Sequence, residues 1–187
     1  SELRPGAVLD LVGGIVAVLI ALIGAGWFVR DRFAPVEVGT RAPDFAAHTL
    51  DGQPISLSHY EGEVILLNIW ATWCPPCREE MPSMQRLYEE LGPEGLKIVA
   101  VSIDADPGVM GPADQVGGNV GEFAREMGLT FDIWRDPAGR IQQTYRTTAV
   151  PETFVIDRSG YIVRKDIGGV MWDTEARKDL IRRLLEQ

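Results

Sequence analysis

The sequence has few of the residues that build metal centres, disulfide scaffolds or nucleic-acid surfaces. Only two cysteines and two histidines occur among 187 residues. Two cysteines cannot form a scaffold of several disulfides or a four-thiolate zinc site. The 18 lysines and arginines are outnumbered by 27 aspartates and glutamates, which gives a net charge of −9. This charge disfavours nucleic acid as a partner, because phosphate binding requires clustered basic side chains.

The N-terminal stretch differs in composition from the rest of the chain. Residues 11–29 are nineteen positions without a charged side chain, and a helix needs roughly twenty apolar residues to cross a bilayer. A cleaved signal peptide is the alternative, with small residues at 24–26, but the apolar run continues through Trp27 to Val29. We therefore predict a tail at 1–10, a transmembrane anchor at 11–29, a linker at 30–38 and a folded domain at 39–187.

The charges beside the predicted anchor bear on its orientation. Arg4 precedes the apolar run, whereas Arg30 and Arg32 follow it. The positive-inside rule, taken alone, predicts that the domain lies in the cytoplasm.

The pattern of the domain predicts strands that alternate with helices. Two short runs at 47–50 and 55–58 are joined through Asp51-Gly52, which is a hairpin signal. The run 64–70 is almost wholly apolar, as in a strand covered on both faces. The remaining predicted elements are a helix at 79–91, a strand at 96–104, a surface loop at 106–118, a helix at 120–127, a strand at 131–134, a helix at 140–145, a hairpin of 153–157 with 161–165, and a helix at 174–186. This order indicates an α/β sandwich with a mixed sheet.

Both cysteines lie in the stretch Cys74-Pro75-Pro76-Cys77, directly after the predicted central strand. Proline is favoured in the first turn of a helix, where the amides have no partner. The free amides and the helix dipole favour negative charge on the Cys74 sulfur. We therefore predict that Cys74 is the thiolate that attacks a disulfide and that Cys77, about one turn further, resolves the mixed disulfide.

Three further residues are candidates for the same site. Glu80 lies three positions after Cys77, on the same helix face, and could tune or deprotonate it; a surface carboxylate is the alternative. Asn68 is a polar residue in the buried strand, either a second polar neighbour of Cys77 or a hydrogen-bonded core amide. Pro151 precedes a strand, and by sequence alone a trans bond after Val150 is expected, since few such bonds are cis.

The motifs of the domain resemble those of the membrane-anchored thioredoxin-like reductases of the TlpA/ResA/CcmG group. The resemblance covers about residues 37–187 and rests on the stretches 68–77, 80–82 and 150–154, with the opening 39–45. It implies a thioredoxin-like sandwich with a mixed central sheet and an N-terminal β-hairpin extension, preceded by one transmembrane helix. It also implies that Pro151 is a cis proline facing the Cys pair. Asn68 stands where thioredoxins proper keep a buried acid, which makes Glu80 the candidate acidic partner.

The resemblance implies protein-disulfide reduction as the activity. Cys74, Cys77, Glu80 and Pro151 would be catalytic, with Asn68 tuning them, and no cofactor beyond the redox-active Cys74–Cys77 disulfide is expected. We expect substrate contacts from the residues that adjoin these groups, namely Trp73, Pro75, Pro76, Val150 and Glu152.

The same resemblance implies a location and partners. Such proteins are anchored by one helix in the bacterial inner membrane, with the domain on the outer, periplasmic side. We give this family location more weight than the opposite orientation that Arg30 and Arg32 favour. They reduce a disulfide-bearing protein there, such as apocytochrome c in cytochrome c maturation or a copper-site protein. A membrane thiol transporter of the CcdA/DsbD type would re-reduce the pair.

Three alternatives fit parts of the sequence. A peroxiredoxin-like peroxidase shares the scaffold, but Ala71 stands where its Thr is normal. A copper-site chaperone would need a histidine ligand, and His48 and His59 lie in the predicted hairpin region; copper held by Cys74 and Cys77 alone stays open. A non-catalytic tether would keep its function after Cys74→Ser.

Overall fold

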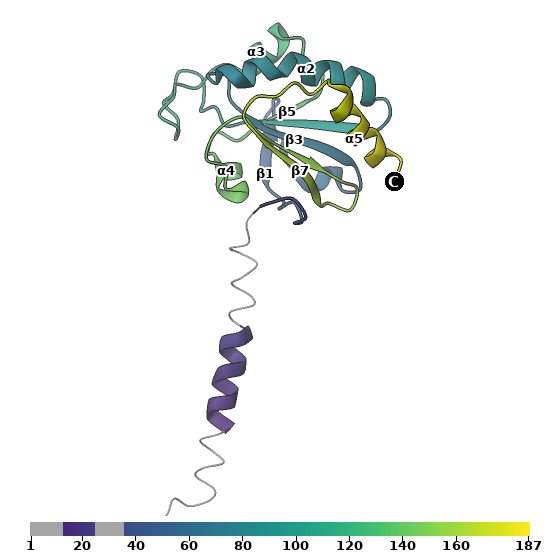
Figure 1. Cartoon of the computed structure of the whole chain (residues 1–187). Helices are drawn as coiled ribbons and strands as arrows, with labels where there is room; N and C mark the ends of the chain where they lie inside the picture. Colours follow the sequence, from purple (N-terminus) through teal and green to yellow (C-terminus); the bar gives the residue numbers. More distant parts are fainter. Residues whose placement is uncertain (1–12, 25–35) are drawn as a thin grey trace, which may run out of the picture. The chain divides into compact units, whose positions relative to one another are not determined.

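The computed structural model describes residues 13–24 and 36–187. The chain divides into two units, Ser1–Pro35 and Val36–Gln187. In the first unit, residues 13–24 form a helix (Figure 1). The side chains of this helix are exposed. No helix among these described residues has the length and hydropathy to span a membrane. The predicted anchor at 11–29 begins and ends outside the described residues. The predicted tail at 1–10 and most of the predicted linker lie outside them altogether.

The second unit is built on one seven-stranded sheet, in the order β2-β1-β5-β4-β3-β6-β7. The elements are β1 Ala46–Thr49, β2 Pro54–Ser56, the 3₁₀ helix η1 Leu57–Tyr60, β3 Val64–Trp70, α2 Pro75–Leu91, β4 Leu96–Ser102, α3 Val120–Glu126, β5 Asp132–Arg135, α4 Arg140–Tyr145, β6 Glu152–Ile156, β7 Ile162–Ile167 and α5 Glu175–Leu185.

The sheet is mixed, as the sequence predicted. Strand β3 pairs parallel with β4, and β4 pairs parallel with β5. Strand β6 runs antiparallel to β3 on its other side, and β7 is antiparallel to β6. All seven residues of β3 are buried, because strands and helices cover both its edges and its faces. The helices α2 and α3 run along one side of the sheet, and α4 lies on the other (Figure 1).

Local signals in the sequence account for most element boundaries. The Asn119 side chain accepts a hydrogen bond from the Glu122 amide and so caps α3. The hairpin β1–β2 forms across Gly52, which has a positive φ of 78°. The prediction of a strand over 55–58 was wrong at its end, since Leu57 begins η1 and its side chain turns into the core.

The compact unit starts slightly earlier than position 39. Val36 is buried, and its carbonyl accepts a hydrogen bond from Lys165 Nζ over 3.2 Å. The segment that we predicted as the end of the linker is therefore packed against β7.

Candidate active site

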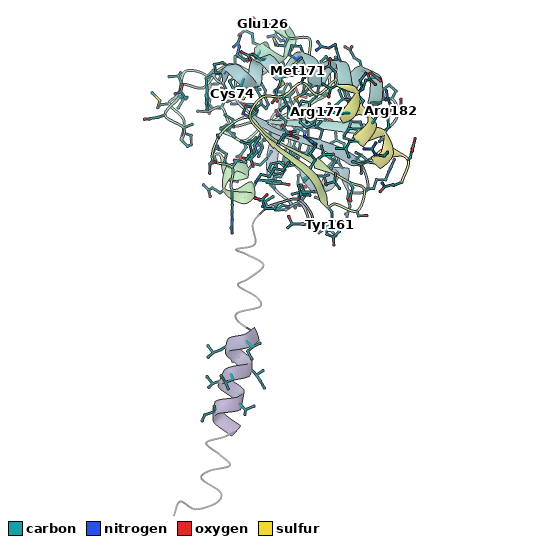
Figure 2. All side chains as sticks on the ribbon, in the orientation of Figure 1. Cys74, Glu126, Tyr161, Met171, Arg177 and Arg182 are labelled. Atoms are coloured by element: carbon teal, nitrogen blue, oxygen red, sulfur yellow. A yellow bond between two sulfur atoms is a disulfide. The ribbon has the colours of Figure 1, made fainter. Side chains whose placement is uncertain are left out.

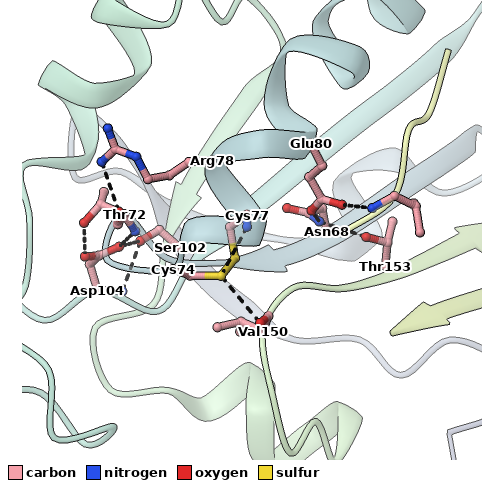
Figure 3. The surroundings of a disulfide bond; sticks show 11 residues. Asn68, Thr72, Cys74, Cys77, Arg78, Glu80, Ser102, Asp104, Val150 and Thr153 are labelled. Carbon is pink, nitrogen blue, oxygen red and sulfur yellow. Dashed lines mark hydrogen bonds between the residues drawn. A yellow bond between two sulfur atoms is a disulfide. The ribbon is translucent and has the colours of Figure 1, made fainter. Parts of the chain in front are cut away.

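Cys74 and Cys77 form a disulfide where the chain passes from β3 into α2 (Figure 3). Cys74 is the N-cap of α2, and its sulfur accepts a hydrogen bond from the Cys77 amide over 3.3 Å. Pro75 and Pro76 occupy the first turn, where no amide is needed. Cys74 is 3% exposed and Cys77 is fully buried. The helix start thus supports negative charge on Cys74, the outer of the two sulfurs.

The loop before β6 faces the disulfide. The Val150–Pro151 peptide bond is cis, as the resemblance implied and against the expectation from sequence alone. Cys74 Sγ lies 3.5 Å from the Val150 carbonyl oxygen. The backbone of Val150 is therefore next to the sulfur that a substrate disulfide must reach.

Glu80 is buried behind the Cys pair, with 1% of its surface exposed, so it is not a surface carboxylate. Asn68 Nδ2 donates to Oε1 over 2.8 Å, and the Val170 amide donates to Oε2 over 3.3 Å. Burial raises the pKa of Glu80 to about 7, while these hydrogen bonds and the charge of Arg177 limit the rise. A carboxyl group with this pKa can accept or release a proton near neutral pH.

Asn68 combines the two roles that the sequence left open. It is a fully buried core amide, and it is also a polar partner within the site. Its Nδ2 donates to Glu80 and to Thr153 Oγ1, each over 2.8 Å. Both amide hydrogens are therefore used, and Oδ1 has no hydrogen-bond partner among the residues that the structure describes.

The connection between β7 and α5 closes the site from the side of Glu80. Besides the Val170 amide, the Trp172 amide donates to Ser83 Oγ on α2 over 2.9 Å. Trp172 is fully buried, and the Arg177 guanidinium lies 4.5 Å above its ring. Sequence reasoning missed this segment because it lies some ninety positions after Glu80 and has no motif of its own.

Asp104 is a second buried acid, on the other side of Cys74 (Figure 3). Its carboxylate accepts from the Thr72 amide at 2.8 Å, Thr72 Oγ1 at 2.6 Å, Ser102 Oγ at 2.7 Å and the Gly118 amide at 3.0 Å. Arg78 Nη1 donates to the Thr72 carbonyl over 3.3 Å. Our sequence analysis missed Asp104, although an acid just after a buried strand is a signal for the carboxyl edge of a sheet.

The predicted substrate-contacting residues fall into two environments. Pro75 and Pro76 are exposed, and Trp73 and Val150 are half-buried beside the disulfide. Glu152 is instead 3% exposed, with a carboxylate oxygen 3.2 Å from Lys165 Nζ, and burial raises its pKa. Substrate contact by all five residues stays a prediction.

The histidines lie apart from these groups. His48 is in β1 and His59 in η1, and both are exposed. In the described ranges, no three His, Cys, Asp or Glu side chains are grouped so that they could hold a metal ion.

A dithiol pair at a helix start, opposite a cis proline and in front of a buried acid, defines a thioredoxin-like thiol-disulfide oxidoreductase. Comparison with known proteins agrees: the chain belongs to the AhpC/TSA family, whose sequence model matches residues 38–165. Thiol-disulfide oxidoreductase ResA of Geobacillus thermodenitrificans is 35% identical over 174 residues, covering 91% of this chain and 94% of that protein. Thioredoxin-like protein YneN of Bacillus subtilis is 36% identical, with 89% and 92% covered.

Solved structures place the fold in the same group. A crystal structure from Chlorobium tepidum, described as thiol:disulfide interchange protein DsbE, has a TM-score of 0.67 and 31% identity, covering 80% of this chain and 99% of that one. StoA from Bacillus subtilis has a TM-score of 0.56 and 26% identity, with 78% and 96% covered. The chain is thus a thiol-disulfide oxidoreductase with a thioredoxin-like fold.

Proposed function

We propose that this protein reduces disulfides in partner proteins, with Cys74 as the attacking and Cys77 as the resolving residue. The observation that carries this proposal is the position of Cys74 at the start of α2, beside the Val150 carbonyl, with Cys77 buried behind it. Cys74 is 3% exposed and Cys77 is fully buried, which favours Cys74 as the sulfur that meets a second polypeptide.

The exchange has two steps. The Cys74 thiolate attacks one sulfur of the partner disulfide, so that a mixed disulfide forms and the partner's other sulfur leaves as a thiolate and takes up a proton. Cys77 then loses its proton and attacks Cys74 Sγ, which releases the second partner thiolate. Two electrons pass from the cysteine pair to the partner, and the Cys74–Cys77 disulfide results. The pair itself carries the electrons, so the proposal includes no added cofactor.

Glu80 handles the proton of Cys77 in this scheme. It lies one helical turn after Cys77, it is shielded from solvent, and its pKa of about 7 suits transfer near neutral pH. Asn68 and the Val170 amide hold its two oxygens and so fix its orientation. These two donors make Glu80 an acceptor directed by the fold rather than a free surface acid.

The place and the partners belong to the same proposal. The apolar run at 11–29 anchors the chain in the bacterial inner membrane with the domain on the periplasmic side. There it reduces apocytochrome c during cytochrome c maturation, or a copper-site protein, and a thiol transporter of the CcdA/DsbD type renews its dithiol. The sequence resemblance to the TlpA/ResA/CcmG group supports this assignment, and it takes precedence over the two arginines that follow the run.

Two measurements test the reductase proposal. Insulin reduction with dithiothreitol as the electron source should be accelerated by the wild type and not by Cys74→Ser. The redox potential of the pair should lie near that of thioredoxin, at about −270 mV, rather than near the −120 mV of disulfide-introducing enzymes. A potential near the second value would contradict reduction as the direction of the reaction.

A further inference from the structure

The loop between β4 and α3, residues 106–118, is folded back on itself. Met110 and Val116 form an antiparallel bridge, and the Gly117 amide donates to the Val109 carbonyl over 2.9 Å. The Gly111 amide donates to the Gln115 carbonyl over 2.8 Å. These bonds make the loop a short two-stranded ribbon with a defined backbone.

This ribbon exposes apolar side chains. Val109 is 53%, Met110 59% and Val116 52% exposed. Between positions 107 and 118 the only charged residue is Asp114, in a protein with a net charge of −9. Ordered apolar side chains that stay in water commonly mark a contact surface, and methionine adapts to varied partners.

The base of the loop is tied to the active site through Asp104. One carboxylate oxygen of Asp104 accepts from the Gly118 amide, at the end of the loop, and from Thr72 Oγ1. The other accepts from the Thr72 amide, two residues before Cys74. Asp106 pairs with Arg135 of β5 over 2.9 Å at the loop's other end. The position of the loop is therefore fixed relative to Cys74.

Two hollows border the loop, and the first of them also reaches Trp73 beside the reactive sulfur. One, of about 250 Å³, lies between Trp73 and Gly118. The other, of about 330 Å³, lies between Pro112 of the loop and Thr147, which is three residues before Val150. A polypeptide bound at Cys74 that extends past Trp73 would enter the first hollow and reach the base of the loop. Figure 2 labels Cys74 on the side of the molecule from which the loop projects.

We propose that the loop 106–118 is a docking surface for an extended, apolar segment of the partner protein next to the disulfide that Cys74 attacks. This inference rests on the proposed protein-disulfide exchange and adds the chemistry by which a partner is selected. The three exposed apolar side chains supply the contact, and Asp104 is a positioning residue that holds the loop beside Thr72. Cys74 itself reacts without the loop.

The experiment uses the reduced full chain and two synthetic peptides, each closed by one disulfide. The peptides differ only at three flanking positions, which are leucine, valine and phenylalanine in one and serine in the other. The wild type should be oxidised roughly tenfold faster by the apolar peptide, the size of effect given by burial of part of an apolar side chain. The variant Val109→Ser/Met110→Ser/Val116→Ser should react equally with both peptides.

Matched controls separate docking from chemistry. The variant Val38→Ser/Leu50→Ser/Tyr161→Ser removes similarly exposed apolar groups outside the loop and should keep the wild-type preference. All three proteins should react at one rate with glutathione disulfide, which is too small to reach the loop.

Two results overturn the inference directly: a loop variant that keeps the preference for the apolar peptide, or a wild type that has no such preference. A loop variant that alters only self-association in sedimentation also overturns it, because the surface would then pair two copies. Failure of the wild type with every disulfide, glutathione included, instead contradicts the exchange activity itself, and the docking inference falls with it.

Discussion

Asn68 in β3 donates a hydrogen bond to Glu80 in α2 over 2.8 Å, and both side chains are buried. This bond joins the central strand to the helix that carries the cysteines. Because the amide offers only its Nδ2 hydrogens here, it favours the ionised form of Glu80. Two opposing effects therefore set the pKa of Glu80: burial raises it, and the hydrogen bond from the Asn68 amide lowers it.

Removal of the amide should disturb that balance in one direction. In Asn68→Leu the carboxylate loses a donor, so the pKa of Glu80 should rise above about 7. A hydrogen bond to a charged group contributes about 1.5–3 kcal/mol, which corresponds to about 1 to 2 pH units. The pH profile of mixed-disulfide resolution should move to higher pH by this amount. Glu79→Gln, on the exposed face of the same helix, should leave the profile in place. An unchanged profile in Asn68→Leu would show that Asn68 has only a packing role.

Glu80 should also make the oxidised protein less stable as the pH rises. Its pKa is about 7 in the folded chain against 4.5 for the ordinary side chain. The folded state therefore binds the proton more tightly, and this contribution is fully present below pH 4.5 and is lost as the pH rises through about 7. Relative to the wild type, the Glu80→Gln variant should therefore gain about 3 kcal/mol of unfolding free energy between pH 4 and pH 8. Urea unfolding at the two pH values measures it, and parallel pH curves for both proteins would contradict the buried, raised pKa.

Asp104 provides a test of the opposite side of the site. Asp104→Asn places an amide donor where Thr72 and Ser102 already donate, so the buried groups lose their acceptor. We expect a loss of about 2–4 kcal/mol in the free energy of unfolding. Asp106 lies two residues after Asp104 and forms an exposed ion pair with Arg135. The change Asp106→Asn should cost less than about 1 kcal/mol. Equal losses in the two variants would mean that the Asp104 network contributes no more than a surface pair.

Substitution by alanine should change stability in opposite directions at two glycines, one at the end of the 106–118 loop and one just after it in α3. A Cβ on Gly118 would overlap Thr72 Oγ1, so Gly118→Ala should destabilise the fold by about 1–3 kcal/mol. A Cβ on Gly121, inside α3, would meet nothing nearer than Asn119 Oδ1 at 3.8 Å. Gly121→Ala should therefore stabilise the protein by about 0.5–1 kcal/mol, in line with helix propensity. Thermal unfolding of both variants checks the packing of the loop against Thr72, which a neutral Gly118→Ala would contradict.

The sequence predicts those parts of the fold that depend on local patterns. The bounds of β3 at 64–70 and of α4 at 140–145 agree with the structure, because a continuous apolar run and a short helix between a turn and a loop are local signals. The cysteine pair and its helix start are likewise readable from Cys74-Pro75-Pro76-Cys77. For these elements neighbouring residues alone determine the conformation.

The remaining features depend on contacts between distant segments. Glu80 is held by the Val170 amide, and Trp172 contacts Ser83 on the same helix, although both residues lie about ninety positions after α2 in the sequence. The partners of Asp104 come from positions 72, 102 and 118, and no sequence pattern joins them. The cis bond before Pro151 is predicted only by resemblance to the reductases, since a trans bond is favoured by local preference.

The central claim is that Cys74 attacks and Cys77 resolves, and trapping of the mixed disulfide tests it most directly. The full-length variants Cys77→Ser and Cys74→Ser are expressed in cells. Acid stops thiol exchange, an alkylating agent then blocks the free thiols, and the adducts are separated by electrophoresis without reductant. Cys77→Ser should accumulate disulfide-linked partner proteins through Cys74, and Cys74→Ser should accumulate few or none. Adducts that form through Cys77 in Cys74→Ser at the same level, or no adducts in either variant, would contradict the account.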